Sequence, residues 1–336
     1  MSSLRALRAS GRVAEGYALV IMAATLWAAG GLIAKWLFTA PGAATQSWVL
    51  QPLGIQIDPV LLSAARAVVA FAIALVYLAA RRRALLAVTV RDLPFLAVFG
   101  VLGLAMVHFA YFKTISLTGV ATAILLEYLA PVIVLVVSAV LLGERPTWTL
   151  PVAVGMSVAG CALMVGAIGG AGLVVSQEGL AWGLASAVFF AGYALMGRWA
   201  AGRYAPWTLL TYGLGAASVF WLVVLGGPGR IIALLADGRA LAAVLVLAVV
   251  STIIPFGAFL KALTMIEATK ASVTSTIEPV IAGLVAWFLF AEYLTLLQLF
   301  GGALVIGAVG LSQARRPLPP EMPVVPEARQ DVPDGA

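Results

Sequence analysis

Two glutamates lie inside long apolar stretches of the sequence, where carboxylates are rare. Glu127 precedes Pro131 by four residues, and Glu278 directly precedes Pro279. Residues four apart on a helix share a face, and a proline has no N–H for the carbonyl four residues before it. The carbonyl oxygen of Glu127, and that of Ser275 at the equivalent position, is therefore expected to be free beside a carboxyl group.

A carboxylate in the middle of a membrane span costs roughly 2.5–3.5 kcal/mol on insertion scales. Each glutamate should therefore face a cavity or a partner. In a cavity it could bind the amine of a substrate or carry a coupling proton. The alternative is a structural ion pair, for example with Arg66 or Lys270. Arg66 is itself alone in an apolar run, where it is expected to order a helix bundle by pairing more readily than to meet substrate.

His108 and Tyr111 are three residues apart in another apolar run and share a helical face. The ordinary pKa of histidine, about 6.5, suits proton relay or hydrogen bonding to a substrate. A hydrogen-bonded core histidine is the equally acceptable structural interpretation.

Aromatic residues within the apolar runs are candidates for a cavity wall that accepts apolar side chains or cations. The substrate-binding candidates of this kind are Trp27, Tyr111, Tyr128, Trp182 and Tyr193. Packing or interfacial anchoring is the competing explanation, most of all for Trp182 near a run's end. Glu144 and Glu292 lie at the ends of runs, where they are expected to cap helices or join loop hydrogen bonds.

The composition is that of a membrane protein. Of 336 residues, 63% are hydrophobic and 10% are charged, against about 25% charged in soluble domains. A single cysteine and a single histidine argue against disulfide frameworks and metal sites, so no cofactor is predicted. The positive net charge lies in short stretches between apolar runs, which reports orientation in a lipid bilayer rather than nucleic-acid binding.

Ten apolar runs are long enough to span about 30 Å of hydrocarbon. They lie at about 16–38, 58–80, 93–113, 118–142, 148–168, 178–200, 206–227, 240–262, 269–291 and 294–313. With residues 1–15 as a basic cytoplasmic segment, fifteen Lys and Arg residues fall on the cytoplasmic side and four on the other. The positive-inside rule therefore predicts that both termini are cytoplasmic. The Pro-rich tail 315–336 is expected to be disordered.

The chain contains an internal repeat. Lys113, Pro131 and Glu144 recur as Lys261, Pro279 and Glu292 at a shift of 148, whereas Glu15 recurs as Glu178 at a shift of 163. The difference predicts an insertion in the first half, most simply in the loop 39–58.

Residues 16–168 and 178–313 thus form two five-span units. Because five is odd, the second unit enters the bilayer from the opposite side. We therefore predict an all-α polytopic membrane protein of ten transmembrane helices in two inverted five-helix repeats, an arrangement that suits a midplane substrate site open to either side in turn. Gly155 with Ala159, and Ala303 with Gly307, are small-residue pairs predicted to form packing faces, which could include a homodimer contact.

The chain resembles the drug/metabolite transporter superfamily in its EamA-like branch. The likeness rests on Ala130–Ile133 followed by Leu142–Pro146, and on Glu278–Ile281 followed by Ala291-Glu292, with Trp27 and Arg66 also matching. Tyr293 stands where an arginine is more usual. The resemblance implies ten helices around a central cavity lined by spans one to four and six to nine. It also implies a multi-pass protein of the cell (inner) membrane that moves small molecules, most readily by export of amino acids or related metabolites.

Two other classes of function compete with transport. Gly155-Met156-Ser157 fits the short Gly-x-Ser pattern of intramembrane serine proteases, with His108 as base, although His108 precedes the serine here. A non-transporting membrane scaffold would leave all activity unchanged in Glu127→Gln. The sequence lacks a Walker-type phosphate-binding loop, so direct use of ATP by this chain is not expected.

Overall fold

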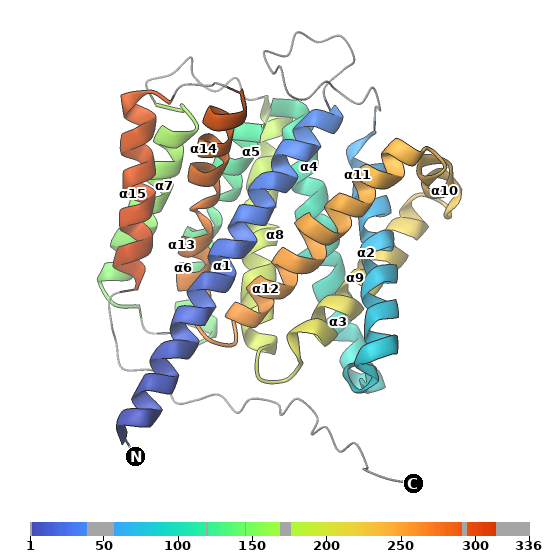
Figure 1. Cartoon of the computed structure of the whole chain (residues 1–336), viewed down its shortest axis with the longest axis horizontal. Coiled ribbons are helices and arrows are strands. Elements are labelled where there is room, and N and C mark those ends of the chain that lie inside the picture. Colours follow the sequence, from blue (N-terminus) through green and yellow to red (C-terminus); the bar gives the residue numbers. More distant parts are fainter. Residues whose placement is uncertain are drawn as a thin grey trace.

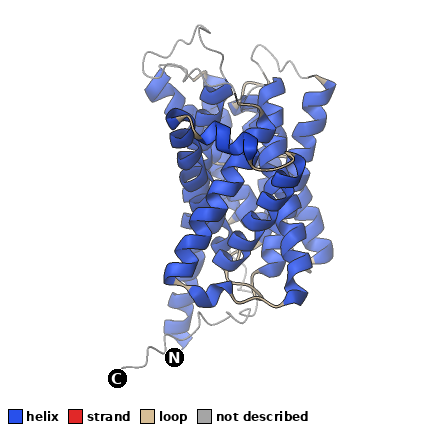
Figure 2. Cartoon of the chain, turned by 90° about the vertical axis from the view of Figure 1, so that its right-hand side faces the viewer, coloured by secondary structure: helices blue, strands red, loops and turns tan. Residues whose placement is uncertain are grey.

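The computed structural model describes residues 2–38, 57–118, 120–144, 146–168, 176–290 and 294–313. Within these ranges the chain is helical and contains no strand, and most of the helices run side by side along the height of the molecule (Figure 2). Most of the predicted insertion, residues 39–56, lies outside the described residues, as do Glu292 and the tail 315–336.

The described helices of the first half include three short segments, two 3-10 and one π-helical. Their bounds are α1 Ser2–Phe38, α2 Pro59–Arg81, η1 Arg83–Leu86, η2 Val90–Asp92, α3 Leu93–Gly100, η3 Val101–Ala105, α4 Met106–Thr118, α5 Val120–Glu127, α6 Ala130–Leu141 and α7 Thr149–Met164. Those of the second half are α8 Gln177–Ala200, α9 Pro206–Val224, α10 Gly229–Leu235, α11 Gly238–Ala248, η4 Val249–Ile253, α12 Ile254–Ala262, α13 Ala268–Ser275, α14 Glu278–Phe290 and α15 Leu296–Ser312. Helix α1 includes most of the basic N-terminal segment.

Seven helical segments are long and apolar enough to cross a membrane, and α7 and α15 are shorter apolar helices. The seven are Gly11–Gly31, Pro59–Arg81, Val90–Thr118, Val120–Leu141, Gln177–Ala200, Pro206–Val224 and Gly238–Ala262. Large apolar side chains point outward, among them Val76, Val136 and Val223, each more than half exposed. Such a surface requires lipid as its solvent, so the chain is a multi-pass membrane protein.

The two halves share their helix breaks in the predicted register. The π-helix Val101–Ala105 recurs as Val249–Ile253, and the short helix Val120–Glu127 recurs as Ala268–Ser275, each 148 residues on. Pro131 and Pro279 lie in the first turn of α6 and α14, where a helix tolerates a residue without an N–H. The spans predicted as continuous over 93–113, 118–142, 240–262 and 269–291 are therefore interrupted, by a π-helix or at a proline.

The helix contacts of one half recur in the other half, with each helix replaced by its repeat counterpart. Helix α1 packs on α12 as its counterpart α8 packs on α4, and α3 packs on α9 as α11 packs on α2. Helices α7 and α15 pack on each other at one side of the bundle (Figure 1).

Helices α1 and α8 run in opposite directions. Glu15, in the first part of α1, pairs with Lys261 of α12 at 2.8 Å. Arg198, in the last turn of α8, donates to the carbonyl of Leu263 directly after α12 at 2.8 Å. The start of α1 and the end of α8 thus meet the same end of α12. This is the lower end in Figure 1, where α1 begins, and we call it the N-terminal end of the bundle.

The small residues that join α7 to α15 are not the predicted pairs. A Cβ on Gly160 would lie 2.7 Å from the Gly301 carbonyl oxygen, so the two backbones touch there. Gly155, Ala159, Ala303 and Gly307 are instead exposed on the outer side of these helices. The packing faces predicted for these pairs are therefore separate from the contact at Gly160 and Gly301, and they stay a prediction. A dimer contact stays a prediction.

Candidate functional site

A cavity lies between the two halves, near the middle of the long helices. Its lining comes from α1, α2, α4, α5, α8, η4, α12 and α14, and comprises Trp27, Gly30, Gly31, Arg66, Val107, His108, Tyr111, Phe112, Glu127, Phe190, Ser251, Phe256 and Glu278. Its volume of about 40 Å³ leaves room for a few water molecules. The cavity is therefore too small for an organic solute in this conformation, which we call the closed state.

Both predicted carboxylates reach this cavity, each with one hydroxyl partner. Glu127, at the end of α5, accepts a hydrogen bond from Ser186 of α8. Glu278, at the start of α14, is 5% exposed, and its Oε2 lies 2.7 Å from the hydroxyl oxygen of Tyr128. The proposed partner Lys270 pairs with Glu267 instead, at 3.3 Å.

Arg66 is buried and has no carboxylate partner among the described residues. Its Nη2 donates to the carbonyl of Ser251 at 3.3 Å, and its guanidinium lies 5.2 Å from the ring centre of Phe112. Its Nε has no hydrogen-bond partner. Buried charges are normally paired, so Arg66 retains donor capacity for a ligand.

Three further polar atoms on the cavity wall lack a hydrogen-bond partner within the described chain. They are Trp27 Nε1, His108 Nε2 and the hydroxyl of Tyr111. Buried polar atoms are rarely left unpaired in native proteins, and each such group needs an explanation. Four such groups surround one cavity that also holds two carboxyl groups, which makes this cavity the candidate binding site.

The internal repeat gives the cavity a polar and an aromatic wall. Trp27 and Phe190 occupy equivalent positions, 163 residues apart, and both line the cavity. His108 and Phe256 are equivalent at 148, and their ring centres lie 4.6 Å apart. Trp27 also contacts Phe256, with ring centres 5.1 Å apart. In both pairs the first half supplies a ring with a polar N–H or nitrogen, and the second half supplies a phenyl ring.

The other predicted aromatics lie behind or away from this lining. Tyr128 reaches Glu278 from the break between α5 and α6. The buried Tyr193 donates to the carbonyl of Phe256 at 2.8 Å. Trp182 packs edge-on against Phe109, with ring centres 5.0 Å apart. The structure does not place Trp182 or Tyr193 in the cavity wall.

Several lining residues were not singled out from the sequence. Phe190, Ser251 and Phe256 line the cavity, and Ser186 binds Glu127 from behind it. Two of them were accessible to sequence reasoning, because Phe190 and Phe256 are the repeat counterparts of Trp27 and His108. Neither serine carries such a signal.

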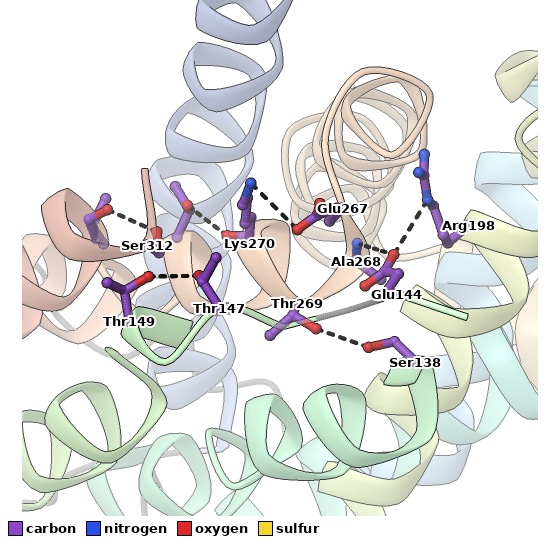
Figure 3. Close-up of polar contacts among 12 residues, drawn as sticks. Ser138, Glu144, Thr147, Thr149, Arg198, Glu267, Ala268, Thr269, Lys270 and Ser312 are labelled. Carbon is purple, nitrogen blue, oxygen red and sulfur yellow. Dashed lines mark hydrogen bonds and ion pairs between the residues drawn. The ribbon is translucent and has the colours of Figure 1, made fainter. Parts of the chain in front are cut away.

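Glu144 connects three segments at the N-terminal end of the bundle (Figure 3). Its Oε1 accepts from the backbone N–H of Ala268, the first residue of α13, at 3.3 Å and lies 3.5 Å from Nε of Arg198 at the end of α8. Burial raises the pKa of the Glu144 carboxyl above its ordinary value, whereas Arg198 acts to lower it. Close by, the hydroxyls of Ser138 and Thr269 lie 3.0 Å apart. This polar cluster closes the bundle between α6, α8 and α13.

A metal site and a serine-protease site are the two other kinds of site to consider. The described residues contain no group of three His, Cys, Asp or Glu side chains able to hold a metal ion. Ser157, the candidate nucleophile, is buried on α7 and donates to the carbonyl of Val154 at 2.9 Å, while His108 lines the cavity.

A multi-pass helical bundle with a polar cavity between two related halves is typical of membrane transporters. The chain belongs to the EamA-like transporter family, whose model matches residues 14–166 and 177–313.

Curated relatives are transporters by name. One from Archaeoglobus fulgidus, an uncharacterized transporter, is 34% identical over 212 residues, which are 62% of this chain and 74% of the relative. The uncharacterized inner membrane transporter YicL of Salmonella typhimurium is 27% identical over 219 residues, 65% of this chain and 72% of its own. A probable terminal-alkyne amino-acid exporter of Streptantibioticus cattleyicolor is 30% identical over 230 residues, 67% of this chain and 74% of its own.

The same fold occurs in a solved crystal structure. It superposes with a TM-score of 0.68 over 89% of this chain and 96% of the other, at 22% identity.

Proposed function

We propose that this protein is a secondary transporter that exports small zwitterionic solutes, amino acids or close relatives, by alternating access at the central cavity. The observation that carries the proposal is the set of four unpartnered polar atoms beside two carboxyl groups. Family membership and the exporter named among the relatives support it.

The cavity chemistry matches both charges of such a solute. Arg66 Nε and Trp27 Nε1 can only donate hydrogen bonds, so they suit a carboxylate. Glu127 and Glu278 can accept from an ammonium group. Phe190 and Phe256 form the apolar wall against which a side chain would lie.

Ten spans in two inverted halves are the architecture that we propose for alternating access. The seven long segments, the shorter α7 and α15, and the broken α13–α14 would be the ten. The exchange of helix neighbours between halves and the opposite directions of α1 and α8 support the inversion. Helices that exchange roles in this way can close one end of the bundle while the other opens.

We place the protein in the inner membrane with both termini in the cytoplasm. The N-terminal end of the bundle carries Lys261, Arg198 at the end of α8, and Arg203 just after it, together with Arg91, whose neighbour Asp92 accepts from Tyr204, as the positive-inside rule requires. The outer end carries fewer basic residues, and Arg230 there pairs with Asp58 at 2.8 Å. The name of the Salmonella relative supports the choice of membrane.

The test is solute flux into proteoliposomes that contain the purified full-length protein. A panel of labelled amino acids, the corresponding amines and N-acetylated amino acids would be compared with protein-free vesicles. We expect flux of at least one zwitterion and little flux of its N-acetyl derivative, which lacks the positive charge. Flux of no compound, or of N-acetyl derivatives alone, would overturn the proposal.

A further inference from the structure

A buried hydroxyl bridges the helix breaks of the two halves. The hydroxyl oxygen of Tyr128 lies 2.8 Å from the carbonyl oxygen of Ser275 and 2.7 Å from Oε2 of Glu278. Tyr128 lies between α5 and α6, whereas Ser275 ends α13 and Glu278 begins α14. One side chain of the first half thus holds both sides of the break in the second half.

The Ser275 carbonyl, at the end of α13, needs a hydrogen-bond donor because Pro279, four residues on, has no N–H. The Tyr128 hydroxyl therefore supplies the hydrogen bond that the helix cannot. A buried carbonyl without a partner is unfavourable, so this contact stabilises the closed break.

The number of hydrogen atoms available for these two hydrogen bonds depends on whether Glu278 is protonated. Tyr128 has one hydroxyl hydrogen, and an ionised carboxylate and a carbonyl are both acceptors only. If Glu278 is protonated, it donates to the Tyr128 oxygen and Tyr128 donates to Ser275, so every group is satisfied. If Glu278 is ionised, the carboxylate is the stronger acceptor and takes the hydroxyl hydrogen, which leaves Ser275 unpaired.

We propose that Tyr128, Ser275 and Glu278 form a proton-operated hinge. With a proton on Glu278, the breaks of the two halves are joined and the bundle is closed. When that proton leaves the carboxyl group for the water that enters the opening cavity, Tyr128 keeps its own proton and turns it to Glu278, and the α13–α14 break is released. The hinge would couple the proposed solute transport to proton movement. Only this coupling role rests on the proposed function, because the hinge itself is argued from its hydrogen bonds.

The surrounding charges agree with one bound proton. Ionisable groups on the cavity wall besides Glu278 are Arg66, His108, Tyr111 and Glu127, and Cys161 of α7 approaches the break from the other side. Lys270 on α13 is tied to Glu267. Helices α6 and α15 carry no ionisable side chain. In α1 and α8 the ionisable side chains are Tyr193, groups that lie toward the helix ends, and Tyr17, which interacts with Glu267.

Arg66 can balance one of the two carboxylates in the cavity. Glu127 receives a hydrogen bond from Ser186, a contact that an ionised carboxylate satisfies without conflict. Two ionised acids beside one guanidinium would leave a net charge in a buried site, which is costly. The proton therefore belongs on Glu278, whose hydroxyl partner has a second acceptor to serve.

Cys161 provides a probe at the hinge. It is the sole cysteine of the chain, is fully buried, and its Sγ lies 3.9 Å from the carbonyl of Thr276 inside the break. Release of the break should expose it to N-ethylmaleimide. Nearby negative charge disfavours the reactive thiolate, so faster labelling with ionised Glu278 would report opening and not a more reactive thiol.

The experiment measures Cys161 labelling rates across a pH series in the full-length protein reconstituted in nanodiscs. Glu278→Gln imitates the protonated acid, so the ratio of wild-type to Glu278→Gln rates cancels the reagent's own pH dependence. We expect a ratio near one at acid pH that rises about fivefold at alkaline pH. This factor corresponds to the loss of one hydrogen bond with a typical net contribution of about 1 kcal/mol. Tyr128→Phe should label rapidly at every pH. Glu127→Gln removes a neighbouring negative charge, so it should keep the rise of the ratio and shift it to lower pH.

A flat ratio, or a profile abolished by Glu127→Gln, would overturn the hinge. If Glu278→Gln does not fold, fast labelling of Tyr128→Phe at acid pH supports the hinge, and slow wild-type-like labelling contradicts it. Labelling requires no solute. A flat ratio in a protein that moves solute therefore removes the hinge alone, whereas a pH-dependent ratio without flux removes only the transport proposal.

Discussion

Lys113 Nζ lies 3.1 Å from Glu178 Oε1, and the repeat places Lys261 and Glu15 in the same relationship at 2.8 Å at the opposite end of the bundle. Both pairs exist in one closed state. They therefore tie α4 to α8 and α12 to α1 as units, and they are not gates that alternate. Motion between these units is what would open the cavity.

The two ion pairs should contribute equally and little to stability. Their side chains are roughly a third to a half exposed, and exposed pairs are worth about 0.2–1 kcal/mol. Double-mutant cycles with Lys113→Gln and Glu178→Gln, and with Lys261→Gln and Glu15→Gln, should give similar small couplings in thermal unfolding. A coupling well above this range for one pair alone would contradict their equivalence.

The contact between α7 and α15 should be intolerant of a single methyl group. In Gly160→Ala the new Cβ would meet the Gly301 carbonyl oxygen at 2.7 Å, and such overpacking costs typically 1–3 kcal/mol. Gly155→Ala, five residues earlier on the same helix, has open space and is the matched control. We expect a lower thermal midpoint for the first variant only. Equal midpoints would show that the two helices can separate freely.

Arg66 should select solutes that carry a carboxylate. In Arg66→Gln the flux of an amino acid relative to its decarboxylated amine should fall about tenfold or more, since a hydrogen bond to a charged group is worth about 1.5–3 kcal/mol. Arg66→Lys, which keeps the charge, should retain part of the preference. An unchanged ratio in folded Arg66→Gln would assign Arg66 a purely structural role.

Glu144 should make stability depend on pH. Because burial raises its pKa in the folded protein, the folded state binds this proton more tightly than the unfolded chain does. Its contribution is present below the unfolded-state pKa and is lost as the pH rises through the folded-state pKa. Glu144→Gln cannot titrate, so the thermal midpoint of the wild type relative to this variant should fall as the pH rises across that interval. A wild-type thermal midpoint that rises relative to that of Glu144→Gln as the pH increases would contradict the raised pKa of Glu144.

Sequence reasoning identified Pro131 and Pro279 as residues that withhold an N–H from a helix carbonyl, because proline acts on its own helix, but it predicted the spans that contain them as continuous. It did not identify Tyr128 as the partner of Ser275, since the two are 147 residues apart and only helix packing brings them together. For the same reason Trp182 and Tyr193 were overestimated as site residues. Spacing along the sequence shows which residues share a face of one helix, but not which other helix packs against that face. Repeat register was the stronger guide, because it places Phe190 and Phe256 in the wall opposite the polar residues.

The central claim is that the cavity acids bind and move a zwitterion. The most direct measurement compares flux of labelled amino acids by wild type, Glu127→Gln and Gly155→Ala in proteoliposomes of equal protein content. We expect zwitterion flux to persist in Gly155→Ala and to fall at least about tenfold in Glu127→Gln, where the ammonium loses a charged partner. Wild-type flux in a folded Glu127→Gln variant would contradict it.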